Sequence, residues 1–74
     1  MSTALLNGAK LKKILAALEG NWQAEMEGYH TYQALADRDA EPVRAQVLRH
    51  LAQAELEHAA RWASRIQELG GPEP

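Results

Sequence analysis

The sequence predicts an all-α protein built as an antiparallel hairpin of two long helices. Ala, Leu, Glu, Gln and Arg dominate the composition, Phe is absent and β-branched residues are few, which favours helix. Helix-breaking residues gather at three places: at Asn7 and Gly8, in the segment DRDAEP (37–42), and in GGPEP (70–74). The two stretches between them have nearly equal lengths, as the arms of a helical hairpin require.

The first helix is expected from about residue 9 to residue 36, after a flexible tail at 1–8. Gly20 and Gly28 are weak points within it, since glycine costs about 1 kcal/mol relative to alanine in a helix interior. Asn21 could cap a new helix after Gly20, so a break at this point is the main alternative.

The second helix is expected to begin near Pro42 and to end near Leu69. Proline suits the first turn of a helix, and either Asp39 or Glu41 could cap it. Glycine suits the cap at the other end and proline prevents continuation, so 70–74 is expected to be a second flexible tail.

Length and charge narrow the classes of protein to consider. A chain of 74 residues forms one small domain (1–74) that usually depends on a metal, a disulfide or a partner for stability. The absence of cysteine removes disulfides and thiol chemistry and is compatible with the reducing cytoplasm, the location we expect. The net charge of −2 argues against nucleic acid as a partner, and no stretch approaches the ~20 apolar residues of a membrane span.

Each expected helix carries an apolar stripe at steps of three and four residues, the spacing of helices that pack in a bundle. The stripe of the first helix comprises Leu11, Leu15, Leu18, Trp22, Glu25, Tyr29, Tyr32 and Ala36. That of the second comprises Leu48, Leu51, Glu55, His58, Trp62, Ile66 and Leu69, with one step of four where three would be regular. Trp22, Tyr29 and Trp62 are interpreted as packing residues.

Glu25, Glu55 and His58 are the ionisable members of these stripes. Glu25 lies about as far before the expected turn as Glu55 lies after it, so the two carboxylates should face each other, with His58 about one turn further along. Burying carboxylates without compensation is very costly. Arg61 and Arg65 are expected to point elsewhere, which leaves a bound metal as the simplest compensation.

A metal site of this kind predicts a dimer. Di-iron carboxylate bundles take one Glu from each of two helices and Glu-x-x-His from each of the other two. This chain supplies one of each, so two copies would supply four Glu and two His, and the four carboxylates would neutralise two divalent cations. We therefore expect a homodimer, or a higher even oligomer, that forms a four-helix bundle. Iron is the expected metal, although Mn²⁺ or Zn²⁺ also fits carboxylate and imidazole ligands.

Other polar residues lie off the stripes or beside the expected ligands. Glu27 and Glu57 are interpreted as solvated surface, with a secondary or entry metal site as the alternative. His30 and His50 are expected on the surface. Tyr32 could either pack or use its hydroxyl to hydrogen-bond a ligand carboxylate and tune the site.

Two motifs resemble a known family. Glu25 followed after six residues by Tyr32, and AxxELEHAxR around Glu55 and His58, are similar to the ligand helices of the ferritin-like superfamily in its rubrerythrin branch. Residues 21–70 look most similar to the ferritin-like domain that precedes vacuolar-iron-transporter-type membrane proteins. The ligand set occurs once rather than twice, a two-helix layout like that of the encapsulated ferritins, and the cysteine-rich rubredoxin domain of rubrerythrin is missing.

The resemblance implies a ferritin-like half-bundle that binds ferrous iron and oxidises it with dioxygen or peroxide, a ferroxidase-type enzyme in iron storage and detoxification. An iron-storage compartment or a transporter is then the expected partner. Two alternatives remain open: an iron-sensing or iron-delivery module without turnover, and a metal-free helical interaction module.

Overall fold

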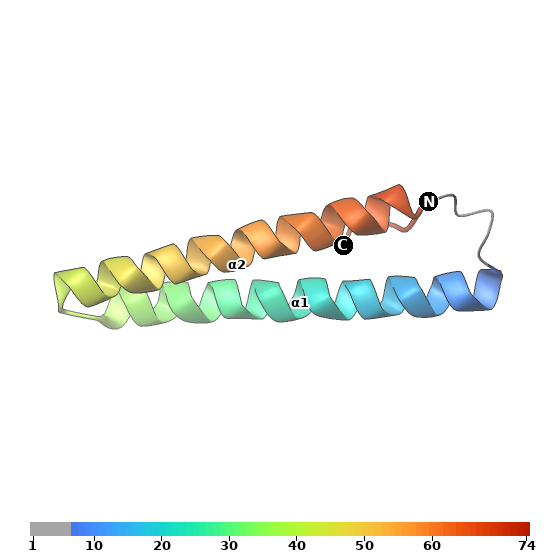
Figure 1. Ribbon diagram of the computed structural model, residues 1–74. Coiled ribbons are helices and arrows are strands. Elements are labelled where there is room, and N and C mark those ends of the chain that lie inside the picture. The colour runs from blue at the N-terminus through green and yellow to red at the C-terminus, as the bar shows by residue number, and fades with distance from the viewer. Residues whose placement is uncertain (1–6) are drawn as a thin grey trace.

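The computed structural model describes residues 7–74, which form two antiparallel α-helices joined by a short turn (Figure 1). Helix α1 spans Gly8–Arg38 and helix α2 spans Pro42–Glu68. The described part of the chain contains no strand, so the predicted all-α hairpin is confirmed. Its extents are 52 × 17 × 14 Å, a rod about one helix thick in one direction and two in the other.

Helix α1 begins earlier than predicted and runs without interruption. The Asn7 side chain accepts a hydrogen bond from the backbone N–H of Lys10 at 2.8 Å, which caps the helix and lets it start at Gly8. The alternative break at Gly20 does not occur. Residues 1–6, most of the predicted N-terminal tail, lie outside the described residues.

Charged side chains close the turn between the helices. The Glu41 carboxylate accepts hydrogen bonds from the backbone N–H groups of Val43 at 3.1 Å and Arg44 at 2.6 Å, and is therefore the cap of α2. Asp39 ends α1, accepts the N–H of Glu41 at 3.0 Å, and accepts a guanidinium N–H of Arg44 at 2.9 Å. Pro42 occupies the first helical turn as predicted.

The C-terminal end of α2 closes with a Schellman motif. Gly70 has a φ of 80°, a conformation that glycine adopts without strain, and its N–H donates to the carbonyl of Gln67 at 3.0 Å. The N–H of Gly71 donates to the carbonyl of Ile66 at 2.9 Å. Gly71 also lies against Leu15 of α1, so the start of the predicted C-terminal tail touches both helices.

The contact between the helices follows the predicted stripe on α1, and on α2 it follows the predicted stripe except at Leu51 and His58. Every member of the α1 stripe is buried or half-buried. On α2, Leu51 is 41% exposed and the alanines beside the predicted positions, Ala52 and Ala59, are 1% exposed. The sequence-based stripe was therefore wrong at Leu51, and it placed His58 too centrally. The true stripe has regular steps of three and four: Ala45, Leu48, Ala52, Glu55, Ala59, Trp62, Ile66 and Leu69.

Apolar side chains left outside this contact gather on one side of the hairpin. Because each helical residue turns by about 100°, Ile14 and Leu35 on α1 and Val47 and Leu51 on α2 all lie on the His58 side of the contact. These four side chains are 37–52% exposed, and we call them the apolar face. The opposite side, which we call the polar side, carries an ion pair across the helices between Arg49 and Asp37 at 2.9 Å, beside the half-buried Met26 and Leu56. A single hairpin thus leaves one of its two faces without apolar partners.

The Asp39 carboxyl in the turn makes the stability of the folded protein depend on pH. The hydrogen bond from Arg44 lowers the pKa of the Asp39 carboxyl below its ordinary value. A lowered folded-state pKa adds stability that is present above the unfolded-state pKa and is lost as pH falls through the folded-state pKa. The thermal midpoint of the wild type, followed by circular dichroism, should therefore fall more steeply on acidification than that of Asp39→Asn. Parallel acid limbs for the two proteins would contradict this prediction.

Candidate metal centre

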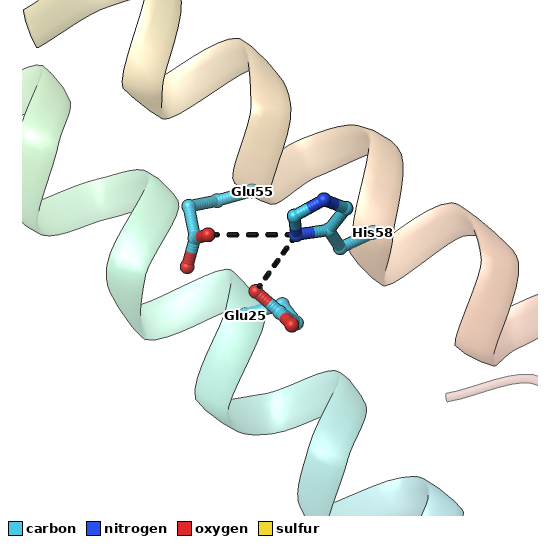
Figure 2. Close-up of side chains that lie close together, drawn as sticks. All are labelled: Glu25, Glu55 and His58. Atoms are coloured by element: carbon cyan, nitrogen blue, oxygen red, sulfur yellow. Dashed lines mark ion pairs between the residues drawn. The ribbon is translucent and has the colours of Figure 1, made fainter.

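Three potential metal ligands meet midway along the hairpin (Figure 2). Glu25 projects from the middle of α1, and Glu55 and His58 project from α2 one turn apart. One ligand atom from each side chain lies within 4.8 Å of the other two. The matched distances of Glu25 and Glu55 from the turn thus bring the two carboxylates to the same level, as the sequence predicts.

The spacing of the donor atoms fits a metal ion. His58 Nδ1 lies 3.5 Å from Glu25 Oε2 and 3.6 Å from Glu55 Oε1. Donors that each bind one ion at about 2.0–2.2 Å are held roughly 3.0–3.5 Å apart by tetrahedral or octahedral geometry. The observed separations are longer than good hydrogen bonds and close to these values. The two distances from His58 therefore suit donors to one divalent cation, and the two carboxylate oxygens lie within 4.8 Å of each other.

The cluster is open on the side of the apolar face. The side chains of Glu25 and Glu55 are 24% and 26% exposed, whereas that of His58 is 45% exposed. Glu55 belongs to the interhelical contact, and His58 stands at its edge. An ion held by these three donors would keep further coordination positions for water or for other ligands.

The charges of the two carboxylates oppose each other. The pKa of the Glu55 carboxyl is raised above its ordinary value, chiefly by a hydrogen bond with Glu25, then by desolvation and by the negative charge of Glu25. His58 acts in the opposite direction with a smaller effect. The protein therefore holds the two carboxylates closer than their ionised forms favour, and a proton or a cation between them relieves the repulsion.

Two arginines lie nearer to the cluster than the sequence suggested. A cleft of about 460 Å³ is lined by Glu25, His58, Arg61, Trp62 and Arg65. Among the described residues neither arginine forms an ion pair with the cluster, since both are exposed and Arg65 pairs with Glu68 at 2.9 Å. They line the same cleft because steps of three and seven residues from His58 keep them on the same edge of α2. This spacing was visible in the sequence.

The remaining candidates are distributed as expected for surface and packing residues. Glu27, Glu57, His30 and His50 are exposed. The stripe aromatics are half-buried, with Tyr29 in an edge-to-face contact with His30 at a ring-centroid distance of 5.1 Å. Tyr32 is half-buried, and its proposed hydrogen bond to a ligand carboxylate stays a prediction.

Comparison with known proteins gives no relative. No protein-family model, no curated protein and no solved structure matches the chain. Within the described residues, neither helix combines the length and the apolar character needed to cross a membrane.

The raised pKa of Glu55 gives a prediction for the metal-free protein. A carboxyl with a raised folded-state pKa contributes stability that is fully present below its unfolded-state pKa and is lost as pH rises through the folded-state pKa. Glu55→Gln removes this loss, so at neutral pH in a chelator its thermal midpoint should exceed that of the wild type, and at acidic pH the two should converge. Glu57→Gln, on the exposed side of α2, should show no such difference. A midpoint for Glu55→Gln at or below the wild-type value at neutral pH would refute this interpretation.

Proposed function

We propose that the protein binds ferrous iron through Glu25, Glu55 and His58 and oxidises it, in a ferroxidase-type reaction at a site shared by two copies of the chain. The observation that carries the proposal is the convergence of two carboxylates and one imidazole from two helices. Oxygen and nitrogen donors of this kind suit divalent first-row metals, iron, manganese and zinc among them. Iron is preferred because the motifs resemble the rubrerythrin branch of the ferritin-like superfamily.

Two features support a shared site. One chain offers three donors and leaves the His58 side of the cluster open, so a second copy could complete the coordination. The apolar face lies on this same open side, and covering it would bury Ile14, Leu35, Val47 and Leu51. Two hairpins packed through this face would form a ferritin-like four-helix bundle with four Glu and two His around two ions.

The electrons of the reaction balance, and the carboxylates of the site match the charge of the ions. Two ferrous ions each lose one electron, and dioxygen takes up both electrons and two protons to become hydrogen peroxide; peroxide as oxidant would yield water instead. Four carboxylates neutralise two divalent ions and also bind the ferric products. Glu27 and Glu57 are candidates for guiding iron to the site, and Tyr32 for a hydrogen bond to a ligand carboxylate. Oxidised iron would then pass to a storage compartment or to a transporter partner.

Two alternatives each have an observation in their favour. The exposure of His58 favours readily exchanged metal, as in an iron-delivery or iron-sensing module without turnover. The apolar face alone would suit a metal-free interaction module. Oxygen consumption during iron addition distinguishes the ferroxidase from the first, and metal-dependent stability distinguishes it from the second.

Metal binding is tested by native mass spectrometry with ferrous iron added under argon. We expect an even oligomer that takes up two iron ions per two chains, followed by oxygen consumption on exposure to air. Glu55→Ala should lose paired binding, because each site would lose a carboxylate, whereas Glu19→Ala, at an exposed position of α1, should retain it. Unchanged binding and oxidation in Glu55→Ala would refute the ligand assignment.

The dimer contact is tested with two variants, each of which places one added charge on a different side of the hairpin. Leu51→Lys places an ammonium group on the apolar face and should shift the protein toward monomer in analytical ultracentrifugation, since an interface core excludes unpaired charge. Gln53→Lys places the same charge on an exposed position of the polar side and should leave the assembly unchanged. Equal behaviour of the two variants would show that the apolar face is not the dimer contact.

A further inference from the structure

Gly28 stands directly against the candidate ligand Glu55. It lies one turn after Glu25 in the interior of α1. A β-carbon built on Gly28 would collide with Glu55 Oε2 and would lie 3.2 Å from its Cδ and 3.3 Å from its Cγ. The carboxylate of Glu55 therefore occupies the space that a side chain at residue 28 would fill.

Backbone conformation does not explain this glycine. Among the described residues, only Gly70 has a positive φ, so Gly28 adopts a conformation open to any amino acid. Glycine in a helix interior costs about 1 kcal/mol relative to alanine. Gly20 also lies inside α1, but a β-carbon added there would have no atom within 4 Å, so this residue provides an internal comparison.

We infer that Gly28 is a positioning residue of the metal centre: its missing side chain is the space that lets the Glu55 carboxylate swing against α1 and oppose Glu25. This inference rests on the proposed metal-binding function. An added methyl group would push the flexible Glu55 side chain toward solvent, to which it is already 26% exposed, without requiring the helices to separate. Gly28→Ala should therefore strengthen the helix and weaken the metal site.

The test compares Gly28→Ala with Gly20→Ala in the full chain. Both remove a glycine from the interior of α1, so both should keep or raise the thermal midpoint of the metal-free protein. Titrated with Mn²⁺ in a calorimeter, Gly20→Ala should bind within about twofold of the wild type, whereas Gly28→Ala should bind about 10–100-fold more weakly, the usual effect of disturbing a residue that orients a ligand. Equal affinities of the two variants would overturn the inference.

The variant Glu55→Asp tests whether Gly28→Ala weakens metal binding by displacing the Glu55 carboxylate. Glu55→Asp withdraws the carboxylate by one methylene group, so adding Gly28→Ala to this variant should cost little further affinity. In a double-mutant cycle the Gly28→Ala penalty should therefore shrink severalfold in the aspartate background. An unchanged penalty would mean that Gly28 acts through the helix rather than through Glu55, and would overturn the inference.

The metal-free protein provides a readout independent of metal binding. Carbon-13 NMR of the side chains at neutral pH should show the Glu55 carboxyl and His58 ring resonances displaced in Gly28→Ala and unmoved in Gly20→Ala. If the wild-type protein binds no metal, the proposed function is refuted. The NMR comparison of Gly28→Ala with Gly20→Ala would still test whether Gly28 determines the position of the Glu55 carboxylate. Unmoved resonances in Gly28→Ala would refute the placement itself.

Discussion

The opposition of Glu25 and Glu55 across a narrow interhelical contact is the constraint on which the rest of the structure depends. The buried residues of this contact are mainly alanines, Ala36, Ala52 and Ala59, whose small side chains let the helices approach closely. Close helices bring the two carboxylates to the same level and raise the pKa of Glu55. A contact with so little apolar volume offers little energy to offset this repulsion. A cation between the carboxylates would turn the unfavourable contact into a favourable one.

The site and the unpartnered apolar surface share one side of the hairpin. His58 stands at the edge of the interhelical contact, and the exposed side chains of the apolar face follow the same edge of both helices. The opposite side is closed by polar contacts such as that between Arg49 and Asp37. In the proposed assembly, dimerisation and metal binding depend on each other. A second copy would cover the apolar face and would also supply further ligands to the metal. Arg61 and Arg65 line the same cleft, and the charge of Arg65 is paired with that of Glu68 at 2.9 Å.

Two glycines, Gly20 and Gly28, weaken the interior of α1, and only Gly28 lies against the cluster. The turn and both ends of the hairpin follow the rules for helix caps closely. Departures from local preference are expected mainly at functional sites, where another requirement overrides stability. In the inferred role of Gly28, the accommodation of Glu55 would be such a requirement, because a larger residue would occupy the position of the carboxylate.

The sequence by itself determined the two helices, the cap at Gly70, the contact stripe of α1 and the register that pairs Glu25 with Glu55. These features follow from local propensity, capping chemistry and a count of residues from the turn. The sequence left the cap of α2 open between Asp39 and Glu41, and the structure assigns it to Glu41. Only the tertiary structure decided that Ala52 and not Leu51 faces α1, because the spacing of apolar residues favours Leu51 although close helices favour the smaller residue. It also decided the exposure of His58 and the close approach of Glu55 to Gly28, since both depend on the distance and rotation between the helices. Periodicity along one helix does not specify these quantities.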